Sequence, residues 1–173
     1  MRIVFLGDSH LARVRRDLPL VGGEVCNAAS GGASARDLVA QATRAAVDDS
    51  DLVVLLVGTN DAAPWKQVSV PAFARAMLDC LESVPSRGWI YLAPPGVDEA
   101  RLTGAGDRTN ATIDAYRDAA LAVCDGVGAG VVRTDRVIEP LGAAAFVDDG
   151  LHLSGPAYKV VLRAIADAVH ETA

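Results

Sequence analysis

A run of six consecutive apolar residues, Leu52–Val57, constrains the fold of this chain more than any other segment. Its sequence, Leu-Val-Val-Leu-Leu-Val, shows no alternation between apolar and polar positions. Because successive side chains of a strand point to opposite faces of its sheet, a strand without alternation is buried on both faces. Such strands are typical of parallel sheets that helices cover on both sides. The segment therefore predicts a parallel sheet at the centre of the fold.

Strand and helix patterns alternate along the rest of the chain. The length of 173 residues fits one domain, and no repeat, linker or low-complexity tract divides residues 1–173. Alternation of this kind predicts right-handed βαβ units, and hence a three-layer α/β/α sandwich around a five-stranded parallel sheet. The predicted strands are Arg2–Leu6, Glu24–Ala29, Leu52–Val57, Trp89–Ala93 and Gly130–Thr134, and the predicted helices are Leu11–Asp17, Ala33–Val47, Val70–Val84, Thr109–Cys124 and Gly155–His170.

Turns rich in glycine and polar residues lie at the ends of the first three predicted strands: Gly7–Ser9, Asn27–Ser34 and Gly58–Asp61. Ligands of open parallel sheets bind beyond the carboxyl ends of the strands. We therefore expect these motifs, which are far apart in the sequence, to meet at one edge of the sheet. The segment Pro94–Arg108 has no periodicity and contains three glycines, so it is predicted to be a mobile surface loop beside that edge.

The chain also contains the residue types that nucleophilic catalysis needs. Ser9 is the predicted nucleophile, and a serine hydroxyl becomes reactive only when a base takes its proton. His152 is the predicted base, because Asp149, three positions earlier, can hold one imidazole nitrogen while the other faces Ser9. Two alternatives stay open at this point: Ser9 acts only as the N-cap of the next helix, or Asp148 is the acid instead of Asp149.

Acyl transfer also needs N–H donors where the carbonyl oxygen becomes negative. The predicted oxyanion hole consists of the Ser9 N–H, the Gly32 N–H and the side-chain amide of Asn60. Ordinary turn chemistry is the alternative for the glycine and asparagine motifs.

Three further residues are predicted to bind the substrate: His10, Asp61 and Trp65. Local packing is the alternative for His10, and surface packing under its loop is the alternative for Trp65. The segment Pro94–Arg108 is a further candidate wall of the acyl or alcohol pocket.

Composition excludes several partners. A net charge of −6 argues against nucleic acid and anionic membranes, and no segment approaches the length of a membrane span. The first residues show no secretory signal, and three cysteines without a Cys-x-x-Cys motif indicate free thiols in a reducing compartment. We therefore expect a cytoplasmic protein that does not insert into membranes and whose partner is a small-molecule ester or another acylated substrate.

Other functions fit the sequence less well. Asp8-Ser9-His10 is an Asp-x-His motif, but a two-metal phosphoesterase needs more histidine, aspartate and asparagine ligands than the later motifs supply. The first turn lacks the Gly-x-Gly-x-x-Gly of dinucleotide-binding folds. A non-catalytic binding module would leave Ser9 unlabelled by a fluorophosphonate. An O-acyltransferase with the same triad stays open, because water and an acceptor alcohol differ only in the deacylation step.

The motifs together resemble the SGNH (GDSL-type) serine hydrolase superfamily over nearly the full length of the chain. Gly7–Ser9 is similar to its first block, and Asn27–Ser34 is similar to its second, Asn-x-Gly-x-x-Gly-x-Thr. Gly58–Asp61 matches Gly-x-Asn-Asp, and Asp149–His152 matches Asp-x-x-His. The resemblance implies a flavodoxin-like sandwich and ester hydrolysis that needs no metal and no cofactor. It predicts an esterase or deacetylase that acts on a small or short-acyl ester through an acyl-enzyme intermediate.

The sequence departs from the superfamily pattern at three positions. His10 stands where leucine or isoleucine is usual, and Ala29 and Ser34 replace glycine and threonine. None of these changes touches the four positions expected to be catalytic. A Gly-Asp-Ser-His start also resembles the SGNH domains of some polysaccharide O-acetyltransferases, which favours an acetyl-sized acyl group.

Overall fold

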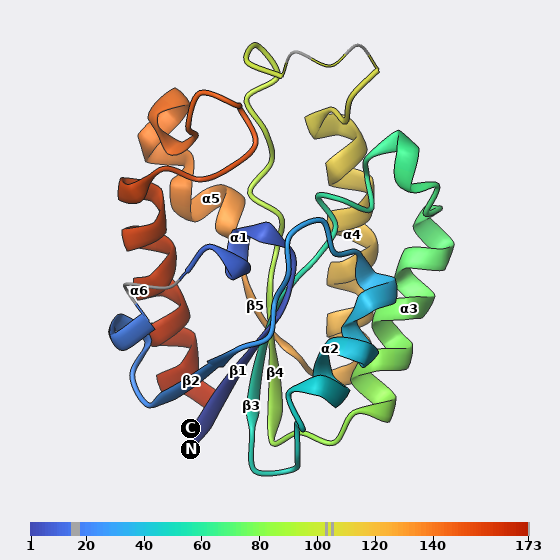
Figure 1. The fold of residues 1–173 in the computed structure, drawn as a ribbon, viewed down its shortest axis with the longest axis vertical. Helices are drawn as coiled ribbons and strands as arrows, with labels where there is room; N and C mark the ends of the chain where they lie inside the picture. Colours follow the sequence, from blue (N-terminus) through green and yellow to red (C-terminus); the bar gives the residue numbers. More distant parts are fainter. Residues whose placement is uncertain (15–17, 103, 105, 173) are drawn as a thin grey trace.

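The computed structural model describes residues 1–14, 18–102, 104 and 106–172. Five strands form one sheet in the order β2-β1-β3-β4-β5, and every pair is parallel (Figure 1). The central strand position agrees with the sequence prediction, since β3 lies between β1 and β4. The strands are β1 (Arg2–Gly7), β2 (Glu24–Asn27), β3 (Leu52–Leu56), β4 (Gly88–Leu92) and β5 (Gly130–Val132).

Helices cover both faces of the sheet, which confirms the predicted three-layer sandwich (Figure 1). The helices α2 (Leu38–Arg44), α3 (Val70–Ser83) and α4 (Asn110–Val127) lie on one face, and α1 (Ser9–Ala12), α5 (Thr134–Ile138) and α6 (Gly155–Thr172) lie on the other. The described residues also form four 3-10 helices: η1 (Leu18–Val21), η2 (Ala35–Asp37), η3 (Pro64–Lys66) and η4 (Glu139–Ala145).

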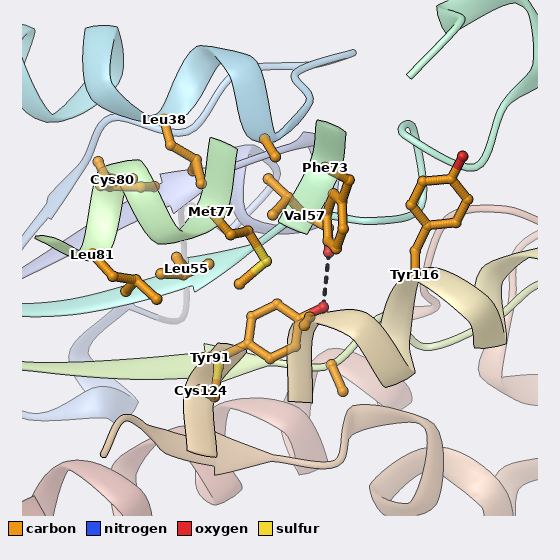
Figure 2. Close-up of a cluster of buried hydrophobic side chains, with 14 of the residues drawn as sticks. Leu38, Leu55, Val57, Phe73, Met77, Cys80, Leu81, Tyr91, Tyr116 and Cys124 are labelled. Carbon is orange, nitrogen blue, oxygen red and sulfur yellow. Dashed lines mark hydrogen bonds between the residues drawn. The ribbon is translucent and has the colours of Figure 1, made fainter. Parts of the chain in front are cut away.

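Each face of the sheet has its own apolar core, and neighbouring residues of a strand divide between the two. Val4 and Leu6 of β1 join the core beneath α2, α3 and α4, whereas Ile3 and Phe5 join the other. Figure 2 shows the first core, where the buried Tyr91 hydroxyl donates to the Val57 carbonyl at 3.1 Å. Full burial of a large apolar side chain contributes about 1.5–3 kcal/mol, so both faces of the strands stabilise the fold.

Several predicted boundaries were wrong for identifiable reasons. The helix expected at Ala33–Val47 is shorter, because Ser34 and Asp37 form a capping box around η2 before α2 begins. The helix expected at Leu11–Asp17 begins earlier, since Asp8 is its N-cap and accepts from the His10 N–H. The prediction's last three residues, 15–17, lie outside the described residues.

The sequence predicted Pro94–Arg108 to be a mobile surface loop, but part of this segment is buried and hydrogen-bonded. Its first residues, 94–97, are buried, and Val97 exchanges two hydrogen bonds of 2.9 Å with the Asn110 side chain. The Asp98 N–H then donates to the Gly150 carbonyl at 2.8 Å. The segment therefore braces the loop that contains Asp149 and His152; residues 103 and 105 lie outside the described residues.

The structure also bears on the expected free thiols and on the possibility of a membrane-spanning helix. Cys26, Cys80 and Cys124 are free thiols. Of the helices in the described part of the chain, none is both long and apolar enough to cross a membrane.

Candidate active site

The turn that holds Ser9 is fixed by the core of the sheet. Gly7 ends β1 with a φ of 130°, and a Cβ there would lie 2.0 Å from the Leu56 carbonyl oxygen of β3. Only glycine permits this close approach of two strands. The buried Gln41 side chain accepts from the Gly7 N–H at 2.6 Å and donates to the Gly7 carbonyl at 2.9 Å. Ser9, the first residue of α1, therefore stands at the carboxyl edge of the sheet, and the N-cap is Asp8 rather than Ser9.

A continuous chain of hydrogen bonds joins Ser9, His152 and Asp149. The Ser9 Oγ lies 3.0 Å from His152 Nε2, and His152 Nδ1 lies 2.6 Å from Asp149 Oδ2. The other oxygen of Asp149 accepts from the Leu151 and His152 backbone N–H groups, each at 2.9 Å. The residues that the sequence predicted as nucleophile, base and acid thus come together across 143 positions of sequence.

Asp149 is held as an anion by this arrangement. Burial alone would raise the pKa of Asp149, but hydrogen bonds from the His152 N–H, the His152 ring and the Leu151 N–H lower it to about 2. Asp148 is exposed and makes no hydrogen bond to any residue that the structure describes. The geometry therefore favours Asp149 over Asp148 as the partner of His152.

A cleft of about 570 Å³ opens beside Ser9 and His152. Gly32 has a φ of 76°, and its carbonyl accepts from Lys66 Nζ at 2.6 Å. Among the described residues, neither the Ser9 N–H nor the Gly32 N–H donates to a protein acceptor, so both can serve a ligand. The cleft is lined by Ser9, Ala12, Arg13, Gly31, Gly32, Asn60, Leu151 and His152.

Asn60 lies in the turn after β3 and presents its amide to the same cleft. Its Nδ2 donates to the Ala33 carbonyl at 3.0 Å. A side-chain amide has two N–H groups, so one remains for another acceptor. The three groups predicted as oxyanion donors therefore line one cleft together with the Ser9 hydroxyl.

Sequence reasoning included Arg108 only as the last residue of a candidate pocket wall and missed its contacts with the turn after β3. Its Nη1 donates to Asn60 Oδ1 at 3.3 Å and to the Thr59 carbonyl at 3.0 Å. The side chain is buried, with its guanidinium 5.0 Å from the centre of the Trp65 ring and its Nε paired with Asp107 at 2.9 Å. An arginine in an aperiodic segment gives no sequence signal of this kind, because its partners come from the turn after β3 and from η3.

The predicted substrate contacts of His10 and Asp61 do not fit their burial, because His10 is 2% exposed and Asp61 is 1% exposed. Asp61 accepts from the Ala35 N–H at 2.9 Å and from the Gly58 N–H at 3.0 Å, so it braces the turn. Burial raises the pKa of Asp61 to about 6 despite these hydrogen bonds. Trp65 is 60% exposed and its ring lies 5.0 Å from the Arg108 guanidinium, so a substrate contact there stays a prediction.

No grouping of three or more His, Cys, Asp or Glu side chains suited to a metal ion occurs within the described part of the chain. The candidate site brings together one hydroxyl, one imidazole, one carboxylate and several N–H donors.

Residues 5–160 match the GDSL-like lipase/acylhydrolase family. The chain belongs to this family. It is an SGNH-type carboxylic ester hydrolase, as the motifs predicted. No curated protein matches the chain.

Solved structures of low sequence identity share the fold over nearly the whole chain. A lipase/acylhydrolase from Enterococcus faecalis is 21% identical with a TM-score of 0.81, covering 99% of this chain and 96% of that one. An acetylxylan esterase from Geobacillus stearothermophilus is 19% identical with a TM-score of 0.75, covering 97% and 93%. An alpha/beta hydrolase enzyme from the metagenome of Lake Arreo, Spain, is 20% identical with a TM-score of 0.74, covering 99% and 96%.

Proposed function

We propose that this hydrolase cleaves small or short-acyl carboxylic esters through a Ser9–His152–Asp149 triad and an acyl-enzyme intermediate. One observation carries the proposal: a continuous hydrogen-bonded chain runs from Asp149 through His152 to Ser9, and Ser9 and His152 line a cleft. Membership of an ester-hydrolase family supports the same chemistry.

In the proposed first step, Ser9 Oγ attacks the ester carbonyl carbon while His152 Nε2 takes the hydroxyl proton. Asp149 holds the Nδ1–H and stabilises the imidazolium, which fits its low pKa of about 2. His152 then gives the proton to the departing alcohol, and the acyl group remains on Ser9. A water molecule then attacks the acyl carbon while His152 Nε2 takes one of its protons. The bond from that carbon to Ser9 Oγ breaks, His152 returns the proton to Ser9 Oγ, and the carboxylic acid leaves.

The negative oxygen that forms in each step needs preorganised donors. In our proposal these are the Ser9 N–H, the Gly32 N–H and the free N–H of the Asn60 amide. Asn60 is itself held by Arg108 and the Ala33 carbonyl, so its amide is oriented before substrate binds. Removing one such donor costs about 10²–10³ in kcat in other enzymes of this kind.

The cleft supports a small acyl group more than a long one. Its walls near Ser9 include Ala12, Gly31 and Gly32, which leave room but offer little apolar surface. The fold is shared with an acetylxylan esterase, so an acetyl ester of a sugar is a suitable first substrate. O-acyl transfer to an alcohol is the second candidate, since the same triad would serve it.

The test combines labelling with a substrate panel. Wild-type protein, Ser9→Ala, His152→Ala and the exposed control Ser83→Ala are treated with a fluorophosphonate and assayed on p-nitrophenyl esters of increasing chain length and on acetylated sugars. We expect labelling and turnover in wild type and Ser83→Ala only, with losses of several orders of magnitude in the site variants. Near-wild-type turnover of Ser9→Ala would overturn the proposal. Product analysis with added acceptor alcohols separates hydrolysis from transfer.

A further inference from the structure

A second buried acid–imidazole pair lies beside the proposed triad. His10 and Asp8 are 2% and 0% exposed, and the rings of His10 and His152 are 5.9 Å apart between centroids. His10 Nδ1 lies 3.0 Å from Asp8 Oδ1, and His10 Nε2 lies 3.1 Å from the Leu151 carbonyl oxygen. The mechanism proposed above uses neither side chain.

The partners of His10 restrict where its protons lie. A backbone carbonyl can only accept, so the Nε2 atom that faces Leu151 must carry a proton. On the other side, Asp8 Oδ1 accepts from the His10 backbone N–H at 2.9 Å and lies 3.0 Å from His10 Nδ1. If Asp8 is the anion of this pair, Nδ1 donates as well, and the pairing makes His10 an imidazolium.

The Leu151 carbonyl belongs to the peptide group that enters His152. The N–H of this same peptide donates to Asp149 Oδ1 at 2.9 Å, and its oxygen faces His10 Nε2. Both polar groups of the peptide are therefore held by side chains. Through Asp8 and His10, the turn that presents Ser9 is tied directly to the backbone that presents His152.

We infer that His10 is a positioning residue: as an imidazolium paired with Asp8, it fixes the Leu151–His152 peptide relative to the Ser9 turn. The inference rests on the proposed function, because it assigns His10 a role in aligning Ser9 with His152. The superfamily pattern usually has leucine or isoleucine here, so the device belongs to this chain rather than to the general mechanism.

The charges around His10 agree with this protonation. Burial lowers the pKa of His10, and the charge of Arg13 lowers it further. The charge of Asp8, the hydrogen bond to Asp8 and the hydrogen bond to the Leu151 carbonyl raise this pKa by more. The pKa of His10 therefore lies above its ordinary value of 6.5. Among the described residues, the ring of His152 also faces His10, and the hydroxyl of Tyr158 lies within reach of the Asp8 and Arg13 charges. Because the folded-state pKa is raised, the pair's contribution to stability is full below pH 6.5 and is lost as the pH rises through the folded-state value.

The first test observes the protons. The chain has only three histidines, so ¹H–¹⁵N spectra of the imidazole groups can be assigned with the variants His10→Gln and His170→Gln. At pH 7.5 we expect His10 to carry protons on both ring nitrogens. A neutral ring with one unprotonated nitrogen would overturn the imidazolium assignment.

The second test measures positioning by kinetics on one p-nitrophenyl ester. His10→Leu removes both contacts, His10→Gln keeps an uncharged N–H donor, and His170→Gln is the control on the exposed end of α6. We expect kcat to fall about tenfold to hundredfold in His10→Leu with KM unchanged, and to recover substantially in His10→Gln. The thermal midpoint of wild type should exceed that of His10→Gln below pH 6.5, and this difference should shrink at alkaline pH.

A double variant separates positioning from folding. His10→Leu leaves the buried Asp8 without its counter-charge, so the single variant is expected to lose stability; Asp8→Asn/His10→Leu removes that charge and should recover the thermal midpoint. We expect kcat of the double variant to remain low. Wild-type kcat in the folded double variant would overturn the inference, whereas activity retained in Ser9→Ala would overturn the proposed function instead.

Discussion

The two halves of the proposed site are held by different parts of the molecule. Ser9 and Asn60 directly follow strands of the sheet, and buried Gln41 and Asp61 brace their turns from within the core. His152 comes from a loop between η4 and α6, with its ring 15% exposed.

The loop half is held mainly by a small set of polar contacts, and Leu153 is the one residue of 146–153 that is a buried member of an apolar core. The Val147 N–H donates to the His152 carbonyl at 2.9 Å, and Phe146 pairs with Leu153 in an isolated antiparallel bridge. From the neighbouring segment, Arg101 Nη1 donates to the Phe146 carbonyl at 3.1 Å. Regions held in this way open with less free energy than core strands. Backbone damage to the nucleophile half should therefore cost more stability, whereas backbone damage to the loop half should lower activity in a folded protein.

A pair of glycine substitutions tests this contrast most directly and has the largest expected effect. A Cβ on Gly7 would lie 2.0 Å from the Leu56 oxygen in the core, so Gly7→Ala should cost about 4 kcal/mol or more of unfolding free energy. A Cβ on Gly150 would lie 2.6 Å from the Asp98 oxygen in the loop, where the φ is 68°. Gly150→Ala should cost only about 1–3 kcal/mol but lower kcat by at least about tenfold.

Urea unfolding and ester turnover, measured on each variant, provide the readouts for this pair. Gly126→Ala is the control, because a Cβ at that position of α4 meets nothing within 4 Å. It should be neutral or slightly stabilising, since alanine favours helix over glycine. A Gly7→Ala protein as stable as Gly150→Ala would refute the contrast between the two halves.

Within the loop, replacing the predicted acid Asp149 should strongly lower kcat. Asp149→Asn keeps the size of the side chain but removes the charge that fixes the His152 tautomer, so kcat should fall by about 10³–10⁴. Asp148→Asn, at the exposed neighbour, should leave kcat within about twofold. Circular dichroism should report the native fold for both. Greater damage from Asp148→Asn would move the acid by one residue, and no loss in either would leave a Ser9–His152 dyad.

The sequence predicted the arrangement of the backbone better than the burial of individual polar side chains. The apolar strand Leu52–Val57 and the strand-end motifs predicted the parallel sheet and the cleft at its edge, because both depend on local pattern. The burial of His10 and Asp61 was not predictable, since a polar residue in a glycine-rich turn reads as a ligand until its tertiary partners are known. The same holds for Arg108, whose partners lie 48 and 49 positions away.

On the sheet side, Asn60 tests the proposed oxyanion hole. Asn60→Ala should lower kcat by about 10²–10³ with KM little changed, because its free N–H acts on charge that develops only in the transition state. Steady-state kinetics on an acetyl ester provide the measurement, and unfolding in urea checks that the turn is intact. A rise in KM at constant kcat would instead make Asn60 a ground-state binding group.

Arg108 should have the smallest effect of this series, because it acts through Asn60. Arg108→Met keeps the apolar stem beside Trp65 but removes the donors to Asn60 Oδ1 and the Thr59 carbonyl, so the amide loses its fixed orientation. We expect kcat to fall about threefold to tenfold. Arg75→Met is the control, since Arg75 is an exposed residue of α3 that pairs with Asp79 on the same helix. The decisive measurement is a double-mutant cycle, because residues that act through one group are not additive. If Arg108 works by orienting Asn60, Arg108→Met should cost almost nothing further in the Asn60→Ala background. An undiminished loss in that background would mean that Arg108 contacts the substrate itself, and that the sheet half of the site extends to the Arg108–Trp65 pair.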